Sequence, residues 1–138
     1  MTQIIKTTGK KIDKKIRHFL RSQKIRLQHL PQQKSSFKYI FHHMPKCAGT
    51  SAVDALTNWF IVIKDYPPAW TDVDNPQVYK KFCRNPKKLD RLKDYHLLVG
   101  HYHLEDSYLP QRYPNCLENK HYQIFTFLRD PLELQISL

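Results

Sequence analysis

Three short apolar runs constrain the fold of this chain more than any other feature. They cover residues 37–44, 96–102 and 121–128 and consist mainly of aromatic and aliphatic side chains on successive positions. Runs of this length without alternation are typical of strands that are buried on both faces of a parallel sheet. Helical patterns separate the runs, so we expect an α/β fold with a parallel sheet flanked by helices.

A helix is expected directly after the first run. Thr50 or Ser51 is placed to cap it, because residues 51–54 have the spacing of a capping box. Apolar residues then recur at helical spacing, at Val53, Leu56, Phe60 and Ile63. Residues 64–76 are rich in turn-forming residues, and residues 77–95 are expected to be helical with a break at Asn85 and Pro86.

The third run is also expected to lead into a helix. Asp130 follows Arg129 at an N-cap position, with Pro131 in the first helical position and Glu133 three residues after the cap. The chain therefore repeats the order of strand, loop and helix at two places.

Positive charge is concentrated near the amino terminus. The whole chain has a formal net charge of +11, and residues 1–36 contribute +9 of it, with Asp13 as their one acidic residue. Residues 37–138 carry only +2, which is ordinary for the surface of an enzyme. We therefore expect a basic segment, 1–36, followed by one α/β domain, 37–138.

Within the basic segment, residues 12–30 have the pattern of an amphipathic helix. Lys and Arg occupy one face, and the other face carries Ile12, Ile16, Phe19, Gln23, Leu27 and Leu30. Such a helix packs its apolar stripe on the domain, or it contacts an anionic lipid surface or a nucleic acid. Phe19 is the one aromatic residue among the basic ones, so nucleic acid is not an expected partner.

Nothing in the sequence indicates a membrane span or a secretory signal. A spanning helix needs about 20 apolar residues, whereas the longest run here is 59–63, and residues 1–15 lack an apolar signal core. We expect a cytoplasmic protein, with peripheral membrane contact through the basic helix as an option. Cys47, Cys83 and Cys116 have no CxxC spacing, which predicts reduced thiols rather than disulfides or a thiolate zinc site.

The junction after the first run has the composition of an anion site. Ligands of parallel sheets collect at the carboxyl ends of the strands, where helix starts offer unpaired N–H groups and partial positive charge. Gly49 allows close approach of the backbone, Lys46 adds a full charge, and the hydroxyls of Thr50 and Ser51 can donate. The lysine precedes the glycine, unlike in G-x-x-x-x-G-K-[ST], so an ATP-binding P-loop is disfavoured.

Both junctions resemble motifs of one enzyme family. Residues 41–51, FHHMPKCAGTS, look like the 5′-phosphosulfate loop of carbohydrate-type sulfotransferases, usually F-I-H-I-P-K-T-A-G-T-S. Residues 127–133, FLRDPLE, resemble with Ser137 the family's 3′-phosphate motif, and Gly100-His101 resembles a Gly-His pair between the two. The resemblance implies the amino-terminal part of a P-loop-like sulfotransferase domain, truncated at its C-terminus, that uses 3′-phosphoadenosine 5′-phosphosulfate (PAPS).

Two positions depart from the family's usual residues. Cys47 stands where Thr is usual and has a similar volume, whereas Leu134 stands where the family usually has Arg. The second departure removes a charge beside the implied 3′-phosphate site.

The implied reaction transfers the sulfuryl group of PAPS in line to a hydroxyl, as on a saccharide, and leaves PAP. His101 is the implied base, with His103 as its rival, and Lys46 is the implied cation at the bridging and sulfuryl oxygens. Arg129 and Ser137 would hold the 3′-phosphate. The 5′-phosphosulfate would lie on the loop residues Pro45, Lys46, Cys47, Ala48, Gly49, Thr50 and Ser51.

No metal is expected in this reaction. His42 and His43 are neighbours on a strand and point to opposite faces, and no carboxylate or thiolate at a familiar spacing completes a site with His101 and His103.

Each implied site residue also has a structural interpretation. His101 can bond a backbone carbonyl, Lys46 can be solvated, and Arg129 can pair with Asp130 or Glu133. Two other functions stay open. One is a nucleotide-binding remnant without transfer, because only three strands are identifiable. The other is a basic binding module that acts through residues 1–36.

Overall fold

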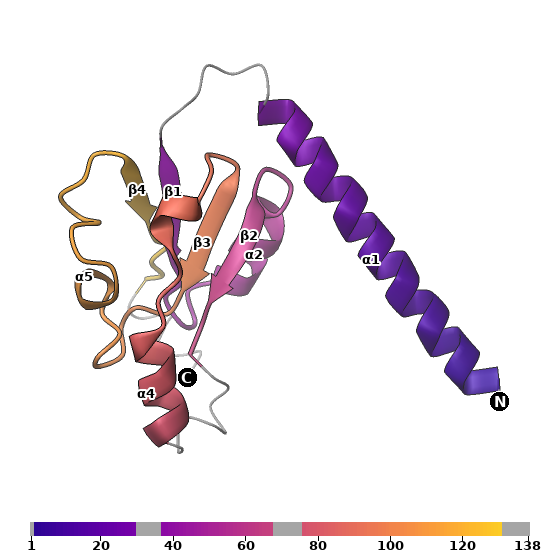
Figure 1. Ribbon diagram of the computed structural model, residues 1–138, viewed down its shortest axis with the longest axis horizontal. Helices are drawn as coiled ribbons and strands as arrows, with labels where there is room; N and C mark the ends of the chain where they lie inside the picture. Colours follow the sequence, from indigo (N-terminus) through magenta and orange to yellow (C-terminus); the bar gives the residue numbers. More distant parts are fainter. Residues whose placement is uncertain (1, 30–36, 68–75, 131–138) are drawn as a thin grey trace. The chain divides into compact units, whose positions relative to one another are not determined.

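The computed structural model describes residues 2–29, 37–67 and 76–130 (Figure 1). The chain divides into two compact units, Met1–Gln33 and Lys34–Leu138, and each is described by itself.

The first unit contains one long helix, α1 (Thr2–His29), which begins well before the amphipathic pattern at residue 12. Ile16, Phe19, Leu20 and Leu27 are each more than half exposed. Helix α1 therefore presents large apolar side chains beside its many cationic ones. None of the described helices is long and apolar enough to cross a membrane.

The second unit is built on a parallel sheet. Its strands are β1 (Lys38–His42), β2 (Ile61–Asp65), β3 (His96–Gly100) and β4 (Tyr122–Phe125), in the order β2-β3-β1-β4. Every neighbouring pair is parallel. In β3, Leu97, Leu98 and Val99 are fully buried on successive positions, as strands covered on both faces require. The prediction of an α/β fold with a parallel sheet is confirmed.

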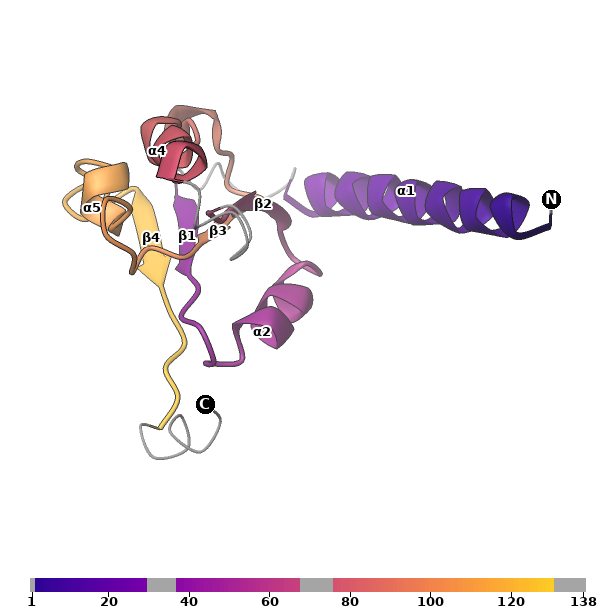
Figure 2. The same cartoon turned by 90° about the horizontal axis from the view of Figure 1, so that it is seen from below.

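Helices cover both faces of the sheet (Figure 2). Helix α2 (Gly49–Leu56) packs on one face, where Val53 belongs to one buried core cluster with Phe41, Leu97 and Val99. Helix α4 (Pro76–Arg84), the 3₁₀ helix η1 (Leu89–Arg91) and helix α5 (Leu109–Arg112) lie on the other side. That face forms a second core cluster whose buried members are Ile40, Leu92, Leu98, Tyr102, Leu109, Tyr113 and Cys116.

Strand β2 corrects the sequence analysis, which expected the helix after the first run to continue to Ile63. The helix ends at Leu56, and the chain enters the strand at Ile61. Val62 then packs with the α2 cluster and Ile63 with the opposite cluster, as alternating strand side chains do. A short apolar run does not by itself separate a strand from a helix, so the helical spacing was misleading.

The three predicted strands are present but shorter than expected. Strand β1 ends at His42, β3 ends at Gly100 rather than at residue 102, and β4 ends at Phe125. Residues 126–130 have no regular secondary structure. Helix α4 ends at Arg84, where the break was expected, but residues 87–95 do not form the expected second helical part and contain only the 3₁₀ helix η1. Pro131, Glu133, Leu134 and Ser137 lie outside the described residues.

A buried ion pair ties β2 to α5. Arg112 Nε and Nη2 donate to the two carboxylate oxygens of Asp65 at 2.7 and 2.8 Å, and both side chains are almost fully buried. The Tyr113 hydroxyl donates to the same carboxylate at 2.5 Å. Arg112 also donates to the carbonyl of Phe82 at 2.8 Å, so one guanidinium joins β2 to the end of α4.

Candidate functional site

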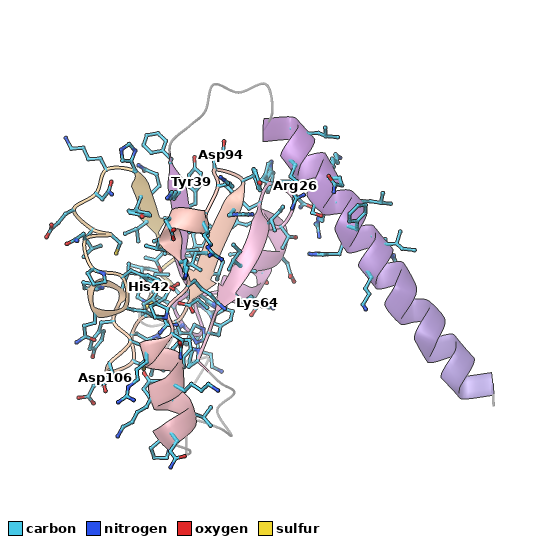
Figure 3. All side chains as sticks on the ribbon, in the orientation of Figure 1. Arg26, Tyr39, His42, Lys64, Asp94 and Asp106 are labelled. Carbon is cyan, nitrogen blue, oxygen red and sulfur yellow. The ribbon has the colours of Figure 1, made fainter. Side chains whose placement is uncertain are left out.

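At the carboxyl ends of the neighbouring strands β1 and β3, the chain leaves the sheet towards opposite faces. The segment after β1 crosses the face covered by α2 on its way to β2, and the segment after β3 crosses the opposite face to β4. Such a switch point leaves a crevice beyond the strand ends, where open α/β sheets bind ligands. Figure 3 shows His42 and Lys64 at this end of the sheet and Asp94 at the other.

The loop between β1 and α2 has a strained backbone. Lys46 and Ala48 have left-handed φ angles of 61° and 53°, although neither is glycine. This conformation costs a non-glycine residue about 1–2 kcal/mol. Strain of this kind clusters at ligand-binding loops, and left-handed residues alternating with ordinary ones form the backbone nests that bind anions.

Helix α2 begins without a side-chain cap. Its N-cap is Ala48, so the prediction that Thr50 or Ser51 caps the helix is wrong. Ala52 donates to the Ala48 carbonyl at 3.0 Å, which leaves the N–H groups of Gly49, Thr50 and Ser51 without partners inside the helix. These N–H groups and the partial positive charge of the helix start suit an anion.

Gly49 is required by packing rather than by its own dihedral angles. A Cβ on Gly49 would lie 1.8 Å from Cδ2 and 2.0 Å from Nε2 of His43. The His43 ring is held there by a hydrogen bond of 2.9 Å between its Nδ1 and the Tyr66 hydroxyl. Gly49, the first residue of α2, therefore leaves room for the His43 ring to pack against the start of the helix.

The two predicted anion motifs meet in one pocket, which we call the Arg129 pocket. Its volume is about 580 Å³, within the range of small-molecule sites. The residues that line it are Cys47, Ala48, Ser51, Ala52, Phe127, Leu128 and Arg129. The two segments meet because β1 and β4 are neighbours, and Thr126 Oγ1 donates to the His42 carbonyl at 2.7 Å, which holds the start of the second segment against β1.

A second pocket, the His101 pocket, lies at the same helix start. Its volume is about 230 Å³, and it is lined by His43, Thr50, Val53, Asp54, Lys64, Tyr66 and His101. The rings of His43 and Tyr66 each lie 4.7 Å from the ring of His101, centroid to centroid, and meet it edge-on. Because Thr50 and Ser51 are consecutive residues of α2, this helix start borders both pockets.

Burial sets the protonation of the histidines. It lowers the pKa of His101 to about 4, and the neighbouring His43, His103 and His42 add to the effect. The pKa values of His42 and His43 are also lowered, first by burial and then by other rings of the group. At neutral pH His101 is therefore an uncharged ring that can accept a proton.

The predicted site residues are not all brought together. Cys47, Ala48 and Ser51 line the Arg129 pocket with Arg129, and Thr50 lines the His101 pocket with His101. Lys46 is exposed and lines neither pocket, and Pro45 lines neither. Gly49 is buried and lines neither pocket, and Ser137 lies outside the described residues.

Four polar residues that line the His101 pocket were not predicted as site residues: His43, Asp54, Lys64 and Tyr66. The turn-rich composition of residues 64–76 predicts connecting structure for Lys64 and Tyr66 and does not indicate β2. A correct assignment of β2 would have placed both at the carboxyl end of a strand, where site residues are expected.

No group of three or more His, Cys, Asp or Glu in the described part of the chain has a geometry that could hold a metal ion. The expectation of no metal stays a prediction.

Comparison with known proteins gives no family for this chain. No protein-family model, no curated protein and no solved structure matches it. The function of the two pockets has to be inferred from their own residues and geometry.

Proposed function

We propose that this chain binds PAPS and transfers its sulfuryl group to a hydroxyl acceptor, as on a saccharide. One observation carries the proposal. The loop that resembles a 5′-phosphosulfate loop and the arginine of the segment that resembles a 3′-phosphate motif line a single pocket. The helix start that borders this pocket also borders the one with the candidate base, His101.

The chain's residues fit a sulfated nucleotide. The N–H groups at the start of α2 suit the oxygens of the 5′-phosphosulfate, and the guanidinium of Arg129 can bind two oxygens of the 3′-phosphate. Phe127 and Leu128 offer an apolar wall for the purine, with exposed fractions of 47% and 77%. A phosphosulfate held at this helix start would agree with the P-loop-like fold type that the resemblance implies, although the lysine of the loop precedes its glycine.

PAPS supplies an activated sulfuryl group when it is bound. His101 would take the proton of the acceptor hydroxyl, because the ring is uncharged at neutral pH and lines the pocket beside the helix start. A pKa of about 4 makes it a weak base on its own. Nearby negative charge favours the protonated ring, so an anionic ligand would raise that pKa towards the working range.

A transfer assay with isotope-labelled PAPS and a panel of saccharides tests the proposal. His101→Ala is expected to lower the rate about 10²- to 10⁴-fold while the circular dichroism spectrum stays native. His103→Ala tests the rival base, and His18→Ala, an exposed residue of α1, is the matched control. Sulfate transfer by His101→Ala at the normal rate would end the assignment of the base.

A second candidate function is nucleotide binding without transfer. The position of Lys46 favours it, because this side chain lines neither pocket and so does not face the place where charge would develop. Tight PAP binding without sulfate transfer to any acceptor, and with no effect of Lys46→Ala, would favour this function over the enzyme.

A further inference from the structure

Four imidazole rings gather at the carboxyl ends of β1 and β3. We call His42, His43, His101 and His103 the histidine cluster. The ring centroids of His43 and His101 lie 4.7 Å apart, those of His101 and His103 5.5 Å, and those of His42 and His103 6.4 Å. The contacts therefore form a continuous chain of rings from one strand end to the next.

Several ring nitrogens of the cluster are buried without a protein partner. Among the described residues, His42 Nε2, His101 Nε2 and His103 Nδ1 have no hydrogen bond. Buried polar atoms are nearly always bonded, and each exception asks for an explanation. A bound ligand that accepts hydrogen bonds from these nitrogens would explain why the protein itself offers them no partner.

Few nearby carboxylates in the described part of the chain can balance charge on the cluster. The carboxylate of Asp65, at the end of β2, is taken up by Arg112 and Tyr113. Tyr66 contributes a hydroxyl bonded to His43, and the hydroxyl of Tyr102, beside His42, is buried and has no hydrogen-bond partner among the residues that the structure describes. The His101 pocket adds one cation, Lys64, and one acid, Asp54.

We propose that the histidine cluster binds a tetrahedral oxyanion and takes up a proton as it does so. Protonation turns an accepting ring nitrogen into a second N–H donor, and the charge of the anion then stabilises the imidazolium. Rings this close repel one another when charged, so about one proton is taken up by the cluster as a whole. The low pKa of His101 in the ligand-free protein fits this coupling.

The proposal deepens the proposed function, and it rests on that function for the source of the anion. With PAPS bound, the sulfuryl group would be the oxyanion on the cluster. The proton would then lie on a neighbouring ring of the cluster, so that His101 itself stays uncharged and can take the proton of the acceptor hydroxyl.

Calorimetric titration of the full chain with sodium sulfate tests the proposal. The titration is run at pH 6.5 in two buffers of different ionisation enthalpy, so that the difference between the observed heats gives the protons exchanged. We expect uptake of about one proton and a Kd that rises up to about tenfold per pH unit between the pKa of the free cluster and the higher pKa of the complex, and that levels off above the latter. Sulfate binding without proton exchange would overturn the proposal, as would no binding to the folded protein.

Single-residue variants test whether the histidine cluster is responsible for sulfate binding and proton uptake. His101→Asn and His103→Asn are each expected to reduce proton uptake and weaken sulfate binding at least tenfold. His18→Asn should change neither, because His18 is exposed on α1. If the cluster variants bind sulfate as before, the anion is held elsewhere and the proposal fails. Tight Zn²⁺ binding that sulfate does not affect and the cluster variants lose would show a metal centre instead, which also overturns it.

Titration with PAP separates this proposal from the proposed function. If sulfate binds with proton uptake but PAP does not bind, the histidine cluster is an oxyanion site and the proposed nucleotide binding is ruled out. The opposite result would be PAP binding while sulfate binding causes no proton uptake by the protein, with or without PAP. It would support the nucleotide site and rule out the proposed role of the histidine cluster.

Discussion

At the scale of single residues, Gly49 has the most specific constraint in the site. Gly49→Ala would place a methyl group on the ring of His43, which the Tyr66 hydroxyl holds in place. We expect a loss of stability of about 1–3 kcal/mol, as for other overpacked positions. The sign of the change in unfolding free energy is informative, because a Gly→Ala change without strain stabilises a protein by about 0.4–1 kcal/mol, through its effect on the unfolded chain.

Urea denaturation of Gly49→Ala measures this effect. Ser51→Ala, two residues further along the helix, adds no atom and should stay within about 0.5 kcal/mol of the parent chain. A stabilised Gly49→Ala protein would mean that the His43 ring does not occupy this space.

The resemblance of the two junctions to one family implied that residues 45–51 and Arg129 bind one nucleotide, and Cys47, Ala48 and Ser51 line a pocket with Arg129. Both motifs directly follow a predicted strand, and the carboxyl ends of parallel strands lie at the same edge of the sheet. The sequence did not predict that His43 packs on Gly49, because that contact depends on Tyr66 and on a strand that was not recognised. The exposed position of Lys46 depends on two left-handed residues for which the sequence has no glycine signal.

At the scale of elements, the Asp65–Arg112 ion pair holds β2, α4 and α5 together. Arg112→Ala leaves a buried carboxylate without its cation, so we expect a loss of about 3–5 kcal/mol in the free energy of unfolding. The double variant Asp65→Ala/Arg112→Ala should lose less than the sum of the two single changes, because neither charge is then stranded.

Denaturant titrations of the single and double variants measure the coupling, with exposed Arg91→Ala as the control. Strictly additive effects would contradict the account of the pair. The pair itself was not foreseeable from the sequence, since 47 residues separate its members and nothing local marks either of them as buried.

Helix α1 carries a prediction that is independent of the two pockets. Exposed Phe19, Leu20 and Leu27 beside many cations are typical of helices that lie on anionic bilayers. We expect co-sedimentation with vesicles that contain phosphatidylserine, little with neutral vesicles, and weakening by salt.

Phe19→Ser/Leu27→Ser should reduce the vesicle binding of α1, whereas Val78→Ser, an exposed apolar residue of α4, should not. Equal sedimentation with neutral vesicles, or none with either kind, would rule out this role.

At the scale of the whole molecule, the histidines link stability to pH. Their pKa values are lowered in the folded protein, so between about pH 6.5 and 4 the unfolded chain binds more protons than the folded one. This contribution therefore makes stability fall as the pH falls through that window.

Thermal denaturation between pH 7 and pH 5 should show the fall in Tm. His101→Gln should make the dependence shallower, and His18→Gln should leave it unchanged. Added sulfate should oppose the fall. A Tm that does not change over this range would mean that the rings are not buried as described.

The central claim is that the β1–α2 loop and Arg129 bind one sulfated nucleotide together. Titration of isotope-labelled protein with PAP, followed by nuclear magnetic resonance, tests it directly. We predict that the amide signals of Gly49, Thr50 and Ser51 and the side-chain Nε signal of Arg129 shift in the same titration with one shared Kd. Shifts confined to one of the two segments, or two unrelated values of Kd, would contradict the claim.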